Sequence, residues 1–282
     1  MPANKRKAKV TLKSLHRIFT IPEAPNSTLG EIEKEMSENL AGFLGNHIVA
    51  TNQALTDIEK DFACSLIPEE PSFVSDHMHH LLDKVVSQSV HTSSPSFIGH
   101  MTSALPYFIL PLSKLMVGLN QNLVKVETSK AFTPLERQVL GMLHRLVYQE
   151  DETFYDRLMH SPSHSLGAFC SGGTVANITA LWVARNNVLK PDGKFKGVAK
   201  AGLYSALSHY GYKGLVILVS ERGHYSLKKS ADVLGIGENS VIKIPTDEYN
   251  KIDCNKLREK CEELTKNNIK ILSIVGVAGT TE

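Results

Sequence analysis

Two continuous apolar runs, GLVILVS at residues 214–220 and IKILSIVGVAG at residues 269–279, constrain the fold of this chain most. A run without alternation predicts a strand buried on both faces, which is typical of a parallel sheet covered by helices. A shorter strand pattern, SVIKIP at 240–245, lies between them, and helical patterns at 224–237 and 253–268 separate the three. Strands that alternate with helices predict an α/β fold with a parallel sheet.

Capping residues predict where the helices begin and end. Asp253 is the expected N-cap of the last helix, and Gly235 is the expected end of the helix before it. The sharpest helix start lies in FTPLERQVLGMLHRLVYQ. There Thr133 is the expected N-cap, Pro134 the first helical residue and Glu136 the partner that completes a capping box.

The first half of the chain has mainly helical patterns. STLGEIEKEMSENLAGFLGNH opens with Thr28 and Glu31 in a capping box, and SDHMHHLLDKVVSQSV has Ser75 as its expected N-cap. Farther on, SLGAFC at residues 165–170 predicts a short strand that ends at two glycines, and a helix is expected to follow them.

The chain divides into three regions by composition and pattern. The cluster KRKAKVTLK within residues 1–20 predicts a basic, disordered tail. Residues 21–103 form the expected N-terminal helical segment, and residues 104–282 the expected α/β domain. With 42% hydrophobic and 21% charged residues, the chain has the composition of a globular protein.

Charge and hydropathy give no indication of a nucleic-acid or membrane partner. A formal net charge of +2 does not indicate a nucleic-acid partner. The apolar stretch ALPYFILPLSKLMVGL is interrupted by Pro106, Pro111 and Lys114, and it is shorter than the ~20 residues that span a bilayer, so we expect no membrane partner. No apolar segment of a signal peptide follows the basic cluster, which favours a cytoplasmic protein.

Neither the cysteines nor the histidine cluster predicts a metal site. The four cysteines form no CxxC pair and are expected to be reduced thiols. His77 and His80 share a helix face beside His79, but the cluster does not complete an obvious metal-ligand pattern. We expect no metal.

Three polar segments follow strands or precede helices where ligands bind in α/β folds. They are SGGT at 171–174, SERGHYS at 220–226 and GTT at 279–281. In open α/β sheets, ligands bind beyond the carboxyl ends of the strands. The convergence of the three segments there is more informative than any one of them.

The segment SGGT can be interpreted in two ways. The first N–H groups of a helix have no partner within the helix and carry partial positive charge, so a phosphate can bind there. Gly172 and Gly173 would let the backbone approach such a group, and Thr174 adds a hydroxyl. The alternative is a tight turn in which Ser171 or Thr174 is an ordinary N-cap. Neither GxGxxG nor GxxxxGK[ST] is present.

His224 and Cys170 also have competing interpretations. A histidine after a strand can stack on a flat ring or transfer a proton, or it can be an ordinary surface residue. Cys170 could be a nucleophile, but its apolar neighbours favour a buried thiol. A serine or cysteine hydrolase is the weaker hypothesis, because neither Ser171 nor Cys170 stands in GxSxG.

Taken in order, these segments resemble the group II pyridoxal-5′-phosphate-dependent decarboxylases. The resemblance covers residues from about 90 to the end, in the order SPSFIGHMTSALP, ETSKAFTPLERQVLGMLHRLVY, FCSGGTVANITALWVARN, SERGHYSLKKSADVLGIG and IVGVAGTTE. Within the family, the sequence of these segments is most similar to the bacterial aspartate 1-decarboxylases. The resemblance implies the large domain of the type I, aspartate aminotransferase-like fold, present in part and preceded by a helical segment.

The resemblance also implies the roles of individual residues. Gly173 and Thr174 would hold the phosphate of pyridoxal 5′-phosphate, and Ser171 and Gly172 would shape that loop. His224 would stack on the pyridine ring and take part in catalysis.

Further roles concern the cofactor and the substrate. Thr281 would lie near the cofactor, and Ser103 and His100 would contact the substrate. His100 and Lys130 are candidates to bind a side-chain carboxylate. The resemblance also implies an amino acid substrate and a homodimer.

The implied reaction is decarboxylation of an acidic L-amino acid, with L-aspartate converted to β-alanine and carbon dioxide, and L-glutamate as the alternative substrate. The family forms its Schiff base through the lysine of a His-Lys pair and holds the pyridine nitrogen with an aspartate, both beyond the GTT segment. This chain has no His-Lys pair. We therefore expect the N-terminal part of a longer enzyme, inactive alone; the alternative is a non-catalytic fragment or regulatory homologue.

Overall fold

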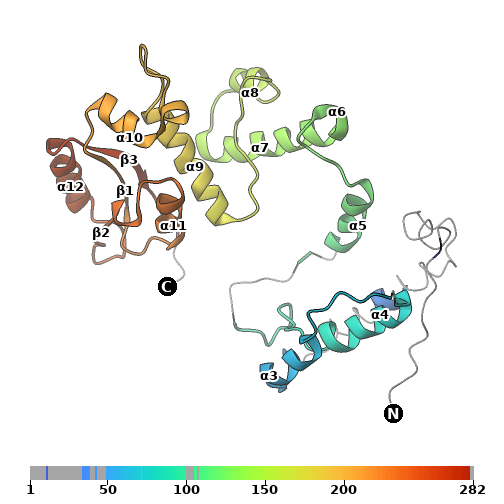
Figure 1. Ribbon diagram of the computed structural model, residues 1–282. Coiled ribbons are helices and arrows are strands. Elements are labelled where there is room, and N and C mark those ends of the chain that lie inside the picture. The colour runs from blue at the N-terminus through green and yellow to red at the C-terminus, as the bar shows by residue number, and fades with distance from the viewer. Residues whose placement is uncertain are drawn as a thin grey trace. The chain divides into compact units, whose positions relative to one another are not determined.

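The computed structural model describes residues 11, 34–38, 42, 49–70, 72–99, 105–106 and 108–279. The chain forms two compact units, Met1–Asn120 and Gln121–Glu282 (Figure 1). The division expected at residue 104 stays a prediction, as does the disordered tail. The predicted helix that starts at Thr28 lies mainly outside the described residues.

The described part of the first unit is helical. Its elements are α3 (Leu55–Ile58), the 3₁₀ turn η1 (Glu59–Phe62), α4 (Val74–Leu81), the π-helical turn η2 (Leu82–Val86) and α5 (Ile109–Leu119). The helix predicted from SDHMHHLLDKVVSQSV is confirmed as α4 with η2. Its predicted cap is wrong, because the N-cap is Phe73 and no side chain caps the helix.

The second unit holds the α/β fold. It consists of α6 (Val126–Ser129), α7 (Phe132–Tyr148), α8 (Glu152–Leu158), α9 (Gly173–Val188), α10 (Val198–Tyr210), β1 (Gly214–Ser220), α11 (Ser226–Val233), the 3₁₀ turn η3 (Glu238–Ser240), β2 (Val241–Ile244), α12 (Cys254–Lys266) and β3 (Ile269–Val275). The three described strands form a parallel sheet in the order β2-β1-β3. The predicted α/β fold with a parallel sheet is therefore confirmed.

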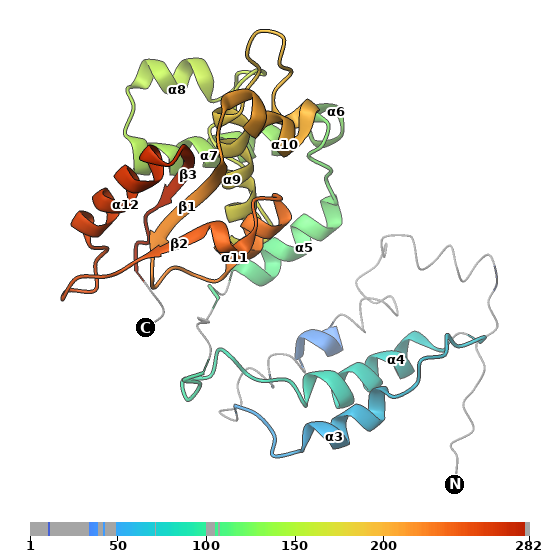
Figure 2. The same cartoon turned by 60° about the vertical axis from the view of Figure 1, so that its left-hand side comes forward.

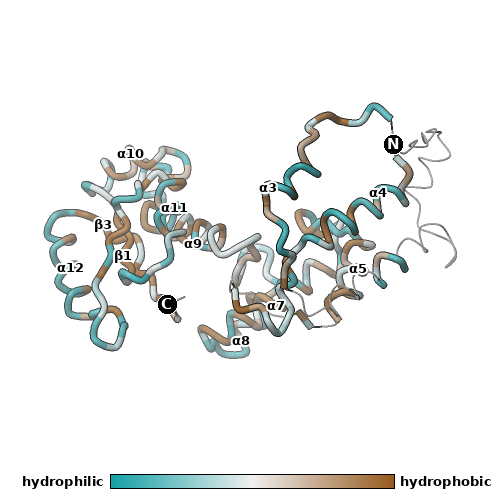
Figure 3. Tube along the Cα trace, turned by 90° about the horizontal axis from the view of Figure 1, so that it is seen from below, coloured by the Kyte–Doolittle hydropathy of each residue, from teal (hydrophilic) through white to brown (hydrophobic). Residues whose placement is uncertain are grey.

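Strand β1 is the central strand of the described sheet, and both of its faces are covered. Ile217 and Val219 pack into a core with α9 and α11, while Val216 and Leu218 pack into a core with α12. Figure 2 shows α12 on one side of the sheet and α9 with α11 on the other. In Figure 3 the trace of β1 is largely brown, and that of α12 is largely teal. Burial on both faces explains the unbroken apolar run.

Helices α9 and α11 form a parallel pair on one face of the sheet. Asn177 of α9 bonds to Ser226 at the start of α11, and Arg185 of α9 bonds to the carbonyl of Leu234 just beyond the end of α11. Both bonds join residues 49 positions apart, so the two helices run in the same direction. Their N-termini therefore lie together at the carboxyl end of β1.

Two predicted helix ends are confirmed. The Asp253 carboxylate accepts hydrogen bonds from the backbone N–H groups of Asn255 and Lys256, at 2.9 and 3.1 Å, as an N-cap does. Gly235 has a φ of 71° directly after the end of α11. Only glycine adopts that left-handed conformation without steric cost, so the helix ends there.

Three local predictions are wrong. Residues 165–170 are not a strand, because no neighbour in the described sheet forms a ladder with them. Thr133 is not an N-cap, since α7 begins one residue earlier and the Thr133 hydroxyl lies 2.5 Å from the Ser129 hydroxyl. Strand β3 is not buried throughout: it pairs only with β1 among the described strands, and Ile274 is half exposed.

Three general features complete the description. No helix among the described residues is long and apolar enough to cross a membrane. Within the same residues, no group of three or more histidine, cysteine, aspartate or glutamate side chains could hold a metal ion. All four cysteines, which lie in the described part, are free thiols.

Candidate cofactor and active site

The start of helix α9 is open and has no side-chain cap. Its N-cap is Gly172, in extended backbone, and the first helical bond runs from the Ala176 N–H to the Gly172 carbonyl at 3.0 Å. The interpretation of Ser171 or Thr174 as an N-cap is therefore wrong. A Cβ added at Gly172 or Gly173 would meet no atom within 4 Å. Residues 171–173 are also exposed, so the start of the helix is accessible, as an anion site requires.

The His224 imidazole is held in place by the first residue of α11. Its Nδ1 lies 2.8 Å from the Ser226 hydroxyl and accepts the Ser226 backbone N–H at 3.1 Å. The ring of Tyr225 lies against the imidazole, with centroids 4.2 Å apart and planes tilted by 34°. His224 itself is exposed, so one ring nitrogen is fixed by the protein while the ring stays accessible.

One side chain connects the two predicted segments. The Asn177 amide, in the second turn of α9, donates to the Ser226 hydroxyl at 2.9 Å. Because Ser226 also bonds to His224, the start of α9 and the histidine belong to one local structure. The predicted convergence of SGGT and SERGHYS is therefore present in the fold.

Other predicted site residues cannot be placed in this way. Thr281, Ser103 and His100 lie outside the described residues. Residues 276–279 follow β3, whose strand lies beside β1 and contacts α9. Lys130 is an exposed residue at the end of α6. The assignment of all predicted site residues to cofactor or substrate stays a prediction.

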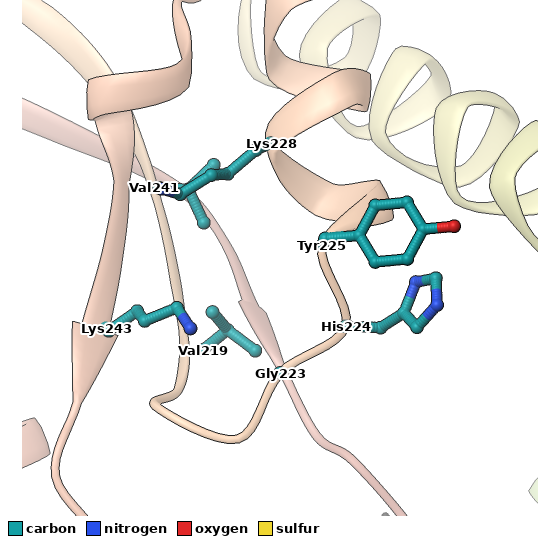
Figure 4. Close-up of a pocket in the computed structure, with 7 residues that line it drawn as sticks. All are labelled: Val219, Gly223, His224, Tyr225, Lys228, Val241 and Lys243. Atoms are coloured by element: carbon teal, nitrogen blue, oxygen red, sulfur yellow. The ribbon is translucent and has the colours of Figure 1, made fainter. Parts of the chain in front are cut away.

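A small pocket lies beside the turn that carries His224. It has a volume of about 150 Å³ and is lined by Val219, Gly223, His224, Tyr225, Lys228, Val241 and Lys243 (Figure 4). In the figure the two rings lie together on one side of the turn, and the two lysines lie on the other. Ligand pockets commonly measure about 300–1,000 Å³, so this pocket alone does not accommodate a cofactor and an amino acid.

The turn is also fixed by a carboxylate. The Glu221 side chain accepts hydrogen bonds from the hydroxyl and the backbone N–H of Thr246, at 2.7 and 2.8 Å. These two bonds lower the pKa of Glu221, with a smaller contribution from the positive charges of Arg222 and Lys243. Glu221 is therefore suited to tie the turn to the segment after β2 rather than to act as a proton donor.

Cys170 has no arrangement that would make it a nucleophile. Among the described residues its sulfur lies near the Ala168 carbonyl and the Thr179 hydroxyl, at 3.9 and 3.7 Å. Neither group is a base that could activate a thiol. The hydrolase hypothesis is not supported by this geometry.

Comparison with known proteins identifies the family. The family model of the pyridoxal-dependent decarboxylase conserved domain matches residues 59–282. The chain belongs to this family. The predicted membership in the group II decarboxylases is thereby confirmed.

Two relatives of this decarboxylase chain are named for aspartate or for acidic amino acids. It is 65% identical over 282 residues to an aspartate 1-decarboxylase of Aliivibrio fischeri, covering all of this chain and 52% of that protein. It is 29% identical over 207 residues to an acidic amino acid decarboxylase of Bos taurus, covering 72% of this chain and 35% of that one. The chain thus spans between about a third and a half of these curated relatives.

Solved structures agree on the fold. The glutamate decarboxylase domain of a transaminase–decarboxylase from Vibrio parahaemolyticus matches with a TM-score of 0.78 and 20% identity, covering 96% of this chain and 55% of that one. A tryptophan decarboxylase of Catharanthus roseus matches with a TM-score of 0.72 and 18% identity, over 93% of this chain and 53% of that one. At these identities the likeness shows the fold alone.

The residues of the decarboxylase chain fit a phosphate-bearing cofactor. The first turn of α9 offers backbone N–H donors beside open space at Gly172 and Gly173, and Thr174 adds a half-buried hydroxyl. An aromatic imidazole, that of His224, belongs to the same local structure. A phosphate and a flat ring are the two parts of pyridoxal phosphate that such groups can bind.

Sequence reasoning did not find Asn177 and Ser226. Asn177 stands inside a helix, where an asparagine is usually a solvent-facing residue, and Ser226 looks like an ordinary residue at a helix start. Their contact spans 49 positions, and no spacing within one element signals it. Only the packing of α9 against α11 brings them together.

Proposed function

We propose that the whole protein is a pyridoxal-5′-phosphate-dependent carboxy-lyase that converts L-aspartate to β-alanine and carbon dioxide. The observation that carries this proposal is the 65% identity to an aspartate 1-decarboxylase along all 282 residues. L-Glutamate is the alternative substrate, because several relatives are named for acidic amino acids or glutamate. A homodimer and a cytoplasmic location stay predictions of the sequence.

The residues of this chain would bind and orient the cofactor. The N–H groups of the first turn of α9 and the Thr174 hydroxyl would hold its phosphate, and Ser171 and Gly172 would set the backbone of that loop. The His224 imidazole would lie against its pyridine ring. When bound, the cofactor supplies a protonated ring that accepts the electron pair left at Cα when carbon dioxide departs. Holding both ends would fix the plane of that ring relative to the substrate.

Product analysis tests the substrate. The whole protein is supplied with pyridoxal phosphate and, separately, with L-aspartate and L-glutamate, and β-alanine and γ-aminobutyrate are quantified. We expect kcat/KM for the conversion of L-aspartate to β-alanine to be higher than kcat/KM for the conversion of L-glutamate to γ-aminobutyrate. A preference for glutamate would overturn the substrate, and no product from either would overturn the proposed activity. The latter result is also what a non-catalytic homologue would give.

A second experiment tests the phosphate site. Gly173 is the first residue of α9, where proline is compatible with helical geometry but has no N–H. The double variant Gly173→Pro, Thr174→Ala therefore removes two donors without breaking the helix. Because a hydrogen bond to a charged group contributes about 1.5–3 kcal/mol, we expect the cofactor Kd to rise by at least about tenfold.

A matched control is available on the same helix. The Thr179 hydroxyl bonds to the Val175 carbonyl within α9 and has no place in the proposed site. Thr179→Ala is expected to keep the cofactor Kd of the unsubstituted protein, measured by titration of cofactor absorbance. Unchanged binding in the double variant would contradict the assignment of the phosphate to α9.

A further inference from the structure

Ser226 is a buried residue with an unusual set of partners. It is 1% exposed, and its hydroxyl lies between the Asn177 amide and His224 Nδ1, at 2.9 and 2.8 Å. Ser230, one turn later and also fully buried, donates its hydroxyl to the Ser226 carbonyl of the same helix at 2.8 Å. The bond made by Ser230 is the common solution for a buried serine in a helix. Ser226 instead connects a second helix to an imidazole.

The donor and the acceptor of each hydrogen bond in this chain can be assigned. The Asn177 amide nitrogen donates to the Ser226 oxygen, and the single hydroxyl proton of Ser226 is then free to point at His224 Nδ1. The backbone N–H of Ser226 donates to the same nitrogen at 3.1 Å. A nitrogen that accepts hydrogen bonds cannot carry a proton of its own, so the neutral ring must carry its proton on Nε2.

We propose that Asn177 and Ser226 are positioning residues that hold His224 in the Nε2–H tautomer and fix the orientation of its ring. This inference rests on the proposed function for the importance of His224, but it concerns the histidine itself and can be measured without turnover. It assigns the second ring nitrogen of His224 as a donor toward the site. It also couples the imidazole to the helix whose first turn would hold the phosphate.

The coupling follows from the position of Asn177. Asn177 lies one turn after Gly173, and α9 is anchored on the sheet by apolar residues that include Leu181. A bond from this helix to Ser226 therefore sets the imidazole relative to the start of α9. Catalytic groups need supporting hydrogen bonds of this kind, because a displacement of about 1 Å can lower a rate by about 100-fold.

The experiment measures the tautomer directly. The whole protein is labelled with ¹⁵N-histidine, and the imidazole ¹⁵N signals of His224, assigned by their loss in His224→Gln, are recorded at about two pH units above the ordinary histidine value of ~6.5. The two nitrogens of a neutral ring have well-separated shifts, so the ratio of tautomers can be determined. We expect the Nε2–H form to dominate in the unsubstituted protein.

Two variants remove the support in different ways. Ser226→Ala deletes the hydroxyl that donates to Nδ1. Asn177→Leu deletes the amide that orients this hydroxyl and keeps the branched shape of the asparagine side chain. Loss of one neutral hydrogen bond is expected to lower the tautomer ratio by about fivefold in Ser226→Ala, and by less in Asn177→Leu. Ser226→Thr, which keeps the hydroxyl, is expected to restore the ratio. Ser230→Ala, the matched buried serine, is expected to leave it unchanged.

The outcomes separate this inference from the proposed function. A dominant Nδ1–H tautomer in the unsubstituted protein, or an unchanged ratio in both Ser226→Ala and Asn177→Leu, would overturn the inference. An altered ratio with unchanged kcat for L-aspartate would support the positioning of the ring and overturn the proposed role of His224. An altered ratio with a lower kcat and a similar KM would support both.

Discussion

The turn before His224 leaves no room for a side chain at Gly223. A Cβ added there would lie 3.0 Å from the Ser220 carbonyl oxygen and 3.3 Å from Val219 Cγ1, and closer still to Val219 Cγ2. Val219 is 1% exposed and belongs to the core beneath α9 and α11, so a shift of its side chain would disturb that core. Carbon atoms in contact are normally about 3.5–4.0 Å apart, so the turn must shift by about 1 Å.

Gly223→Ala is therefore expected to displace His224, the next residue in the chain. Overpacking of this kind costs about 1–3 kcal/mol of folding free energy. If His224 has its proposed role, a shift of about 1 Å would also lower kcat for L-aspartate by as much as about 100-fold. Steady-state kinetics on the whole protein, with cofactor occupancy measured in parallel, gives both quantities, and thermal denaturation gives the loss of stability.

Two further variants isolate the steric cause. Gly214, at the opposite end of β1, has open space where a Cβ would be placed, so Gly214→Ala is expected to keep activity and stability. Adding Val219→Ala to Gly223→Ala removes two of the three close contacts and is expected to restore part of kcat. A Gly223→Ala protein with unchanged kcat and melting temperature would refute the reasoning, because it would mean that the turn adapts without moving His224.

Two other predictions concern stability. Asp253→Ala removes both N-cap bonds of α12 and is expected to lower the free energy of unfolding by about 1 kcal/mol, seen as a lower urea midpoint. Asp253→Asn, which can still accept these bonds, is expected to retain most of the stability. Hydrogen bonds from Thr246 lower the pKa of Glu221 in the folded state, so its stabilising contribution is present above the ordinary glutamate value and is lost as pH falls through the lowered one. Glu221→Gln is thus expected to lose less thermal stability between about pH 6 and about pH 3 than the unsubstituted protein, and an equal loss would contradict this account.

The parts of the fold that sequence could predict are those decided by local chemistry. The unbroken apolar run of β1, the Asp253 cap and the stop at Gly235 depend on residues close together in the chain. The strand expected at 165–170 is absent, because none of the three described strands pairs with these residues, and sequence does not show which strands are neighbours. The start of α7 was misplaced since the Thr133 hydroxyl bonds to Ser129 instead of to the helix backbone.

The candidate site divides in the same way. The open helix start at Gly172 and the strand-end position of His224 follow from patterns that sequence displays. The bond between Asn177 and Ser226 depends on how two helices pack, and both residues have ordinary alternatives in sequence. Sequence therefore displays the candidate residues, but it does not show the hydrogen bonds that support the histidine.

The parallel pairing of α9 and α11 favours the proposed anion site at this edge of the sheet. Each helix presents the positive end of its dipole there, and side-by-side dipoles of equal direction repel each other. Burial of Leu181, Leu227 and Ala231 in their shared core offsets that repulsion.

At the opposite ends of the two helices, the Arg185 guanidinium donates to the Leu234 carbonyl at 3.0 Å and places a cation near the negative end of α11. Burial lowers the pKa of Arg185, so its charge is partly desolvated there. With the negative ends compensated by a cation and the positive ends held together through Asn177, a bound anion would complete the electrostatic balance of the pair.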